Sequence, residues 1–229
     1  MNQWIIWIIA GVFLLAPWVI SAKTIRNLMI SLRLPISWIS ALPYQGWGEV
    51  RGSIRGNTVR NPIDQSDCAF YQLEVKEYRS HGKGGSWRTI YKEMSAPFEI
   101  DDMTGRIKVQ KSNAQVVVRN DLRLKVDSAR RMTLENLGIN TKGLFGFDKR
   151  LRVYLRLIAP GEEILVVGKI VNLAGGISIS GKETVPIIIS DLTRSELLKR
   201  LAWQAVKPMI ITYLVGLIIM AIFLWNFVR

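Results

Sequence analysis

The sequence predicts a membrane-anchored, β-rich (α+β) protein in which a small OB-like β-barrel domain lies between two transmembrane helices. Long uncharged apolar runs occupy both ends of the 229-residue chain, and all 18 acidic residues lie between Glu49 and Glu196. In the middle, apolar and polar residues alternate with the period of two that is typical of strands. The expected order is a first transmembrane helix at 1–22, an amphipathic interfacial connector at 23–45, the barrel at 46–190, a connector helix at 191–207 and a second transmembrane helix at 208–229.

The two apolar runs, Trp4–Ala22 and Met209–Val228, contain no charged residue. A helix of about 20 residues crosses a hydrocarbon core of about 30 Å, so each run is long enough to span a bilayer. The alternative for the first run is a cleaved signal peptide. That alternative is disfavoured because no Lys or Arg precedes the run, which is also longer than the apolar core of most signal peptides.

The Lys and Arg residues that flank the spans predict the orientation of the chain. Only Arg229 lies beyond a span, whereas the flanks that face the middle segment carry Lys23, Arg26, Arg33, Arg194, Lys199, Arg200 and Lys207. Because cytoplasmic flanks are enriched in Lys and Arg, this asymmetry puts the central domain in the cytoplasm and both termini outside an integral cytoplasmic (inner) membrane. The same basic residues are expected to contact anionic headgroups of the lipid bilayer.

Helices are expected on the domain side of both spans. After the first span, apolar residues recur at helical spacing, and Pro35 bends or ends the helix; these residues are Ile25, Leu28, Met29, Leu32, Ile36 and Ile39. This segment would either lie in the headgroup layer or pack on the domain, and the pattern favours neither. Before the second span, Thr193 and Glu196 have the spacing of a capping box, which starts a helix.

Alternating side chains predict about eight short strands between Gly46 and Ile189. The clearest examples are residues 71–76, 106–110 and 152–157, where apolar side chains alternate with charged or polar ones. Turns rich in Gly separate the strands, and a short helix is expected at Ala129–Leu137. Many short strands with one inserted helix indicate a small closed or partly open barrel.

The chain has a single Cys and a single His, Cys68 and His81. This count excludes a disulfide scaffold and a four-ligand Cys/His zinc site. A Cys68–His81 nucleophile pair lacks an evident third residue to orient it, and a lone Cys is more often a small buried hydrophobe. The glycine loop around residues 82–85 lacks the order of a phosphate-binding loop. The sequence therefore predicts no catalytic residue, no metal and no cofactor.

The segment Asp101-Asp102-x-Thr104-Gly105 places two carboxylates and a hydroxyl within five residues. A metal site is one interpretation, but calcium loops need more oxygen ligands at set spacing. The favoured interpretation is a turn stabilised by Asx hydrogen bonds, with Gly105 at a positive φ.

The basic excess, a net charge of +13, has two interpretations. A barrel with exposed Arg and aromatic residues can bind single-stranded nucleic acid by stacking, and Tyr78, Trp87 and Tyr91 are the candidate platforms. Lipid headgroups explain the charge more economically, because the positive-inside rule already accounts for many of the cations. Nucleic acid is therefore an unlikely partner.

Several short motifs, taken in order, resemble those of the GIDE domain family, also called BAM for "beside a membrane". The resemblance covers about residues 46–190 and is carried by Gly48-Glu49-Val50-x-Gly52, Cys68-x-x-Tyr71, Trp87, Pro97-Phe98-x-x-Asp101-Asp102-x-Thr104-Gly105, Ile158-x-Pro160-Gly161-Glu162 and Val167-Gly168. It implies a barrel fold between two spans. Relatives in mitochondrial and chloroplast outer membranes are RING ubiquitin ligases, but the eight Cys/His ligands of a RING are absent here.

The resemblance therefore implies a RING-less member that is not itself an enzyme. The first functional hypothesis is a cytoplasmic binding or scaffolding barrel that engages a membrane protein or further copies of itself. The second is a component of a ubiquitin-like modification pathway that acts with a separate catalytic chain. The third is nucleic-acid binding at the membrane surface.

Overall fold

The computed structural model describes residues 22, 25–30, 32–43, 45–56, 58–82, 84–95, 97–110, 113–143, 146–173, 176–181 and 185–228. The predicted span at Trp4–Ala22 and the basic residue Lys23 lie outside these residues, apart from Ala22. The chain divides into two compact units. One is Ile36–Leu192, and the other combines the two chain ends, Met1–Pro35 and Thr193–Arg229. The larger unit thus begins at Ile36, ahead of the boundary expected at Gly46.

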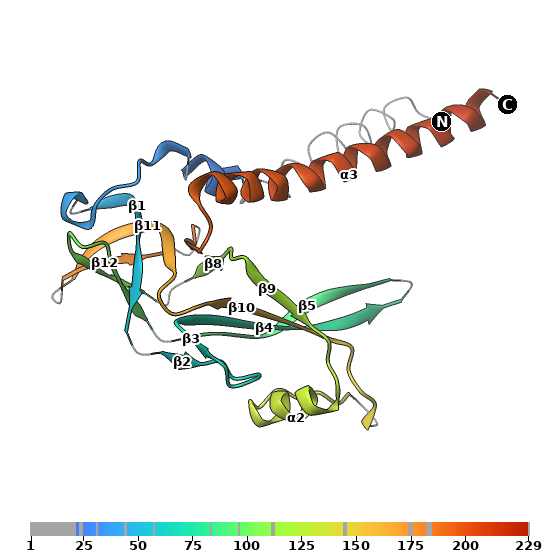
Figure 1. Cartoon of the computed structure of the whole chain (residues 1–229). Coiled ribbons are helices and arrows are strands. Elements are labelled where there is room, and N and C mark those ends of the chain that lie inside the picture. Colours follow the sequence, from blue (N-terminus) through green and yellow to red (C-terminus); the bar gives the residue numbers. More distant parts are fainter. Residues whose placement is uncertain are drawn as a thin grey trace. The chain divides into compact units, whose positions relative to one another are not determined.

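Five strands of the larger unit close into a barrel (Figure 1). They are β1 (Gly46–Arg55), β6 (Phe98–Asp101), β7 (Arg106–Val109), β11 (Glu163–Leu173) and β12 (Gly176–Ser180). Their order is β1-β6-β7-β12-β11, and pairing of β1 with β11 from Gly46↔Ile170 to Ser53↔Glu163 completes the circle. Closure leaves no free edge among these strands, and five strands is the number of an OB-like barrel. The predicted barrel is confirmed.

Two short strands extend this sheet beyond β11. β13 (Ile187–Ser190) pairs with β11, and β8 (Ala114–Val116) pairs in parallel with β13. A separate ribbon consists of β2 (Val59–Arg60) and β3 (Asp67–Cys68).

The barrel is filled by apolar side chains that alternate inward along its strands. The core includes Val50, Ile100, Ile107, Val109, Ile164, Val166, Ile170 and Ile179, all almost fully buried. Phe70 and Phe98 meet in it edge to face, with ring centroids 5.4 Å apart.

Two residues that precede β1 also belong to the barrel core. Residues 25–30 and 32–33 are helical, but a short 3-10 turn, Ile39–Ala41, follows Pro35 instead of more α-helix. Ile39 and Leu42 are buried in the barrel core. The expectation that Ile36 and Ile39 continue the interfacial helix is therefore wrong, because Pro35 ends the helix and burial in the barrel redirects the chain.

The insertions between barrel strands build a second, four-stranded sheet with the order β5-β4-β10-β9 (Figure 1). β4 (Phe70–His81) and β5 (Gly84–Met94) lie between β1 and β6 in the sequence, whereas β9 (Asn120–Leu124) and β10 (Leu151–Ile158) lie between β7 and β11. Long-range pairing of β4 with β10, from Phe70↔Ile158 to Glu77↔Leu151, joins the two insertions. The predicted alternation in 71–76, 106–110 and 152–157 is confirmed.

One face of this second sheet packs on the helix α2 (Ser128–Asn136). Asp127 caps α2 by accepting a hydrogen bond from the amide of Arg130 at 2.9 Å. Leu134 of α2 lies in a second core with residues of the sheet, namely Tyr71, Leu73, Val75, Val153 and Leu155. The predicted helix at 129–137 is therefore present, shifted by one residue.

The smaller unit contains the long helix α3 (Arg194–Val228). The predicted capping box is present: the Glu196 carboxylate accepts from the amide of Thr193 at 2.9 Å, and the Thr193 hydroxyl accepts from the amide of Glu196 at 3.4 Å. The connector helix and second span expected at 191–207 and 208–229 are one continuous helix that contains Pro208. Among the described residues, one helix is long and apolar enough to cross a membrane, over Arg194–Ile219 of α3.

Candidate interaction surface

The face of the four-stranded sheet opposite α2 gathers basic and aromatic side chains. We call it the aromatic–basic face, and its members are Lys76, Tyr78, Trp87, Arg123, Arg150, Arg152, Tyr154 and Arg156. The register explains why they share a face: Arg152 pairs with Lys76, Tyr78 with Trp87, and Tyr154 with Arg123. Because side chains alternate along a strand, β10 sends Val153 and Leu155 to the core and the residues between them to this face.

Cations lie over aromatic rings along this face. The guanidinium carbon of Arg152 is 3.7 Å from the centroid of the Trp87 ring, and that of Arg150 is 4.7 Å from the centroid of Tyr78. The Tyr78 and Trp87 rings are themselves 5.3 Å apart. Farther along the same two strands, β4 and β10, the ammonium group of Lys76 lies 5.3 Å from the Tyr154 centroid. The rings are thus partly covered by the chain's own cations, which leaves them poorly placed as open platforms for bases.

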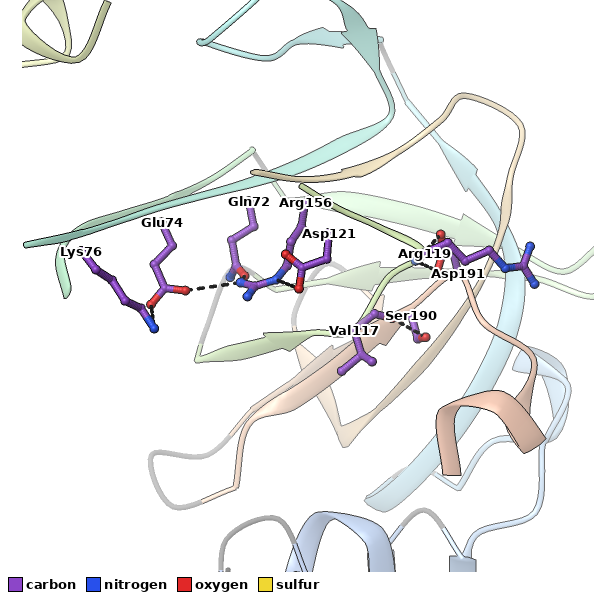
Figure 2. Close-up of polar contacts among 9 residues, drawn as sticks. All are labelled: Gln72, Glu74, Lys76, Val117, Arg119, Asp121, Arg156, Ser190 and Asp191. Atoms are coloured by element: carbon purple, nitrogen blue, oxygen red, sulfur yellow. Dashed lines mark hydrogen bonds and ion pairs between the residues drawn. The ribbon is translucent and has the colours of Figure 1, made fainter. Parts of the chain in front are cut away.

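Ion pairs order the middle of the face (Figure 2). The Arg156 guanidinium lies 2.8 Å from the Gln72 amide oxygen, 3.4 Å from the Glu74 carboxylate and 3.2 Å from the Asp121 carboxylate. Burial alone would raise the pKa of Glu74, but a hydrogen bond from Thr89 and the nearby charges of Lys76 and Arg156 lower it. Glu74 therefore stays ionised and holds these cations in place.

Tyr91 does not belong to the aromatic–basic face, contrary to the sequence-based expectation. Strict alternation along β5 would put Tyr91 on the same side as Trp87. A β-bulge between Val75 and Lys76 shifts the register, so that Thr89 pairs with Lys76 and Tyr91 with Val75. The extra residue sends Tyr91 to the second core.

Both side chains of the Cys68-x-x-Tyr71 motif form hydrogen bonds within the domain. Cys68 is buried, and its thiol donates to the Val59 carbonyl at 3.3 Å; burial, followed by the charges of Asp64 and Asp67, raises the pKa of this thiol. Tyr71 donates to the Glu93 carboxylate at 2.9 Å, and burial together with this bond raises the pKa of Tyr71. His81, the other member of the nucleophile pair that the sequence disfavours, is in β4, and its side chain lies outside the described part of the structure.

Tyr91 is the second tyrosine that forms a hydrogen bond to Glu93. Its hydroxyl donates to the other carboxylate oxygen at 2.6 Å. This hydrogen bond, with some burial, raises the pKa of Tyr91 to about 12. Both phenols therefore remain protonated donors at neutral pH.

The Asp101–Gly105 segment forms the turn between β6 and β7. The Asp102 carboxylate accepts hydrogen bonds from the Thr104 amide and hydroxyl at 2.9 and 2.7 Å and from the Gly105 amide at 3.1 Å, which are the expected Asx bonds. The expectation of a positive φ at Gly105 is wrong, because Met103 is the residue that takes the left-handed conformation, with φ 69°. Gly105 is instead a point of close approach, since a Cβ there would lie 3.0 Å from Cγ2 of Ile39.

Close approach also explains the glycines of the other motifs. A Cβ on Gly52 would lie 2.6 Å from the Asp101 carbonyl oxygen, one on Gly48 would lie 2.4 Å from the Ile170 side chain, and one on Gly168 would lie 2.8 Å from Ile179. Glu49 is fully buried on β1, and its carbonyl accepts from the Ser37 amide at 2.9 Å.

The remaining family-motif residues lie at turns and strand ends. Pro160 and Gly161 turn the chain from β10 to β11, with Gly161 at φ 81° as in a type II turn. Pro97 is exposed directly before β6, which begins with Phe98.

A cluster of buried hydrogen bonds, which we call the polar joint, links the segment that follows β8 to the end of β13 and the two residues after it (Figure 2). The Ser190 hydroxyl donates to the Val117 carbonyl at 2.6 Å and accepts from the Leu192 amide at 3.1 Å. Asp191 accepts from the Arg119 amide at 2.9 and 3.1 Å. Burial raises the pKa of Asp191 in spite of these bonds.

The expected membrane-surface cations lie in the smaller unit, apart from Lys23, which is outside the described residues. Arg26 and Arg33 are exposed on the first helical segment, and Lys199, Arg200 and Lys207 are exposed on α3. Arg194 donates a hydrogen bond to the Leu34 carbonyl, so the two chain ends meet. On α3, Trp203 is 60% exposed between Lys199 and Lys207, a combination suited to a membrane interface.

The described residues contain no group of three or more His, Cys, Asp or Glu residues that could hold a metal ion. The arrangement is a surface of Arg, Lys, Tyr and Trp side chains in contact with one another. Only Tyr78 and Trp87 of this face were predicted from the sequence, and the other six members were not: Lys76, Arg123, Arg150, Arg152, Tyr154 and Arg156. For Arg152, Tyr154 and Arg156 the signal was their alternation along one predicted strand, which indicated a cationic outer face.

These features define a β-barrel protein with an aromatic–basic face and a C-terminal helix that is able to cross a membrane. The chain belongs to the GIDE family: a family model described as an E3 ubiquitin ligase matches residues 71–225, which include β4 through most of α3. The resemblance seen in the sequence is thereby confirmed, and the protein is ubiquitin ligase-related and of a membrane-associated family. No curated protein and no solved structure matches the chain.

Proposed function

We propose that this chain is a two-span membrane protein whose cytoplasmic barrel domain is a non-catalytic binding module. Its partner is a membrane protein that presents an acidic segment to the aromatic–basic face. The observation that carries the proposal is the row of cations over rings, in which Arg152 lies over Trp87 and Arg150 over Tyr78.

The composition of the face supports a protein partner. Trp, Tyr and Arg dominate the hot spots of protein interfaces, because they combine large apolar area with directed hydrogen bonds. The intramolecular stacking holds Arg150 and Arg152 in fixed positions, so less side-chain entropy is lost on binding.

The charge of the face supports an acidic partner over a second copy of the chain. Its cations, Lys76, Arg123, Arg150, Arg152 and Arg156, outnumber the adjacent carboxylates of Glu74 and Asp121. Two copies that met through this same face would oppose like charges, which disfavours a symmetric dimer.

A non-catalytic role is supported by the burial and the raised pKa of the Cys68 thiol. Cys68 is the single cysteine of the chain, is 2% exposed and has a raised thiol pKa, so little thiolate forms at neutral pH. The cytoplasmic orientation is supported by the basic residues on the domain side of the spans, of which Arg26, Arg33, Lys199, Arg200 and Lys207 are exposed.

Site-specific photo-cross-linking of the full chain in cells tests the proposal. A photoreactive phenylalanine analogue replaces Tyr154, and a second variant carries it at Phe147, a 75% exposed position outside the aromatic–basic face. We expect one discrete adduct from position 154 and none of that size from position 147. Arg152→Glu should abolish the adduct, whereas Lys108→Glu, on the exposed side of barrel strand β7, should leave it. Equal adducts at both positions, or an adduct insensitive to Arg152→Glu, would refute the proposed face.

The family match favours one alternative, in which the partner is a separate catalytic chain of a ubiquitin-like pathway. Mass spectrometry of the adduct distinguishes the two. A partner with a RING or a catalytic cysteine supports the alternative, and a membrane protein without either supports the scaffold.

A further inference from the structure

We propose that Trp38 and Met103 form a membrane-inserting tip on the barrel domain, which enters the headgroup layer of the bilayer that anchors the chain. The proposal rests on the membrane attachment proposed above. It adds a second point of contact, made by the barrel unit itself and separate from the aromatic–basic face.

The tip presents large apolar side chains to solvent. Met103 is 95% exposed, Trp38 is 62% exposed and Ile36 is 44% exposed. Ile36, Trp38 and Met103 line one open surface pocket together with residues of β1 such as Gly52 and Ser53. A side chain as large as Trp gains nothing from such exposure in water, whereas Trp is enriched where membranes meet water.

The backbone holds Met103 outward at a cost in local strain. Its φ of 69° is one that residues other than Gly, Asn and Asp rarely adopt. Asp101 and Asp102 impose this conformation: the Asp101 carboxylate accepts from the Met103 amide at 2.8 Å, and Asp102 accepts from the next two amides. A strained tip that carries Met where Gly would fit indicates a use for the side chain.

The same turn ties the tip together. The Asp102 carboxylate accepts from the Ile39 amide at 2.7 Å, and the Thr104 hydroxyl accepts from the Ser40 amide at 3.3 Å. The segment that carries Trp38 is therefore fastened to the turn that carries Met103, so the two side chains act as one rigid wedge.

The occupant is the bilayer because of where the tip lies in the chain. Trp38 follows the helical residues 25–30 and 32–33 after only a few residues, and that segment follows the predicted span at Trp4–Ala22. Exposed Leu32 and Arg33 end that helical segment, and exposed apolar side chains continue into the barrel unit at Ile36 and Trp38. Exposed Arg55 and Arg106 both form ion pairs with Asp101, so two cations offset this carboxylate beside the wedge.

Spin labelling of the full chain in phosphatidylcholine–phosphatidylglycerol nanodiscs tests the wedge. The single native cysteine, Cys68, is buried, so the wild type should take up little label and an introduced cysteine is labelled selectively. Met103→Cys and Trp38→Cys each report on the tip, so the loss of one variant to misfolding leaves the other. Phe147→Cys is the matched control, since it is also an exposed apolar position.

Collision rates with oxygen, which partitions into lipid, and with the polar complex NiEDDA then measure depth. We expect the labels at positions 38 and 103 to gain oxygen accessibility and lose NiEDDA accessibility relative to the label at position 147. Equal NiEDDA accessibility at all three positions would overturn the proposal. Shielding from both reagents at 38 and 103 would also overturn it, because it would identify a protein contact instead. The cross-linking at position 154 is read independently, so a failure here is distinguishable from a failure of the proposed binding face.

Discussion

The carboxylate of Asp102 accepts a hydrogen bond of 2.7 Å from the backbone amide of Ile39, which lies 63 residues earlier in the chain. The same carboxylate accepts three further bonds from Thr104 and Gly105 within its own turn. One side chain thus fastens the segment that enters the barrel to the turn between β6 and β7. The segment enters the core at Ile39, so this contact couples a local turn to the closure of the barrel.

Replacement of Asp102 by Ala should destabilise the barrel domain. The change leaves the buried Ile39 amide and three part-buried donors of Thr104 and Gly105 without this acceptor, and we expect the free energy of unfolding to fall by roughly 2–4 kcal/mol. Denaturant unfolding of the full chain in mild detergent measures it. Asp101→Asn is the control, because the ion-pair partners of Asp101, Arg55 and Arg106, are exposed and contribute little. Equal losses in both variants would contradict the role assigned to Asp102.

Acid should weaken the same contact. Burial alone would raise the pKa of Asp102, but hydrogen bonds from Ile39, Thr104 and Gly105 lower it below the ordinary value of about 3.9. A carboxyl whose pKa is depressed in the folded state stabilises the fold above its unfolded pKa, and that contribution is lost as pH falls through the folded pKa. The stability difference between wild type and Asp102→Asn should therefore be constant above about pH 5 and shrink below about pH 4. If this stability difference grew on acidification, the pKa of Asp102 would not be lowered in the folded protein.

Gly105 should not tolerate even a methyl group. A Cβ at this position would lie 3.0 Å from Cγ2 of Ile39, inside the barrel's entry segment. We expect Gly105→Ala to lower the free energy of unfolding by about 1–3 kcal/mol through overpacking. Gly84→Ala is the matched control, because a Cβ on Gly84 meets nothing within 4 Å. If the two variants unfold at the same denaturant concentration, the close approach of Gly105 to Ile39 does not affect stability.

The stacking of Arg152 on Trp87 should be measurable as a coupling energy. A double-mutant cycle with Arg152→Gln and Trp87→Leu should give about 0.5–1 kcal/mol, as expected for a cation–π pair near the surface. The control cycle pairs Trp87 with Arg123, which lies on β9 at the other edge of the sheet. That control should show additivity, and a coupling for Arg123 as large as that for Arg152 would mean that the effect is not contact-specific.

Ser190 should be more important for stability than its small side chain suggests. Its hydroxyl donates to the Val117 carbonyl and accepts from the Leu192 amide, and it is fully buried. Ser190→Ala leaves both groups unsatisfied and should lower the free energy of unfolding by about 1–3 kcal/mol. Ser80, whose hydroxyl donates at 3.4 Å in an exposed part of β4, is the control. Thermal unfolding followed by circular dichroism should show a lower unfolding temperature for Ser190→Ala and little change for Ser80→Ala. Comparable decreases in the two variants would contradict a stabilising role for the Ser190 hydrogen bonds.

Elements that depend on near neighbours in the chain could be predicted from the sequence. Alternation identified the faces of β4, β7 and β10, because the period of a strand is a local property. The capping box of Thr193 and Glu196 was equally readable, since it involves residues within one helical turn, whereas Pro35 indicated either a bend or an end of the helix. The long uncharged run in α3 likewise indicated a helix able to cross a membrane.

How these elements combine is evident only in the folded chain. Closure of the barrel depends on pairing of β1 with β11, more than a hundred residues apart, and no local pattern specifies that partner. The same holds for the second sheet, in which two separate insertions meet through β4 and β10.

The candidate face shows why this difference matters. Trp87 and Tyr91 have the same parity in the sequence, and only the bulge opposite Val75 and Lys76 separates them onto opposite faces. Likewise, Met103 and not Gly105 is the left-handed residue of the β6–β7 turn, and what requires glycine at position 105 is the close approach to Ile39 from a distant segment. Periodicity fixes which side chains alternate, but register and close packing depend on partners that are remote in the chain, and these can be known only once the chain is folded.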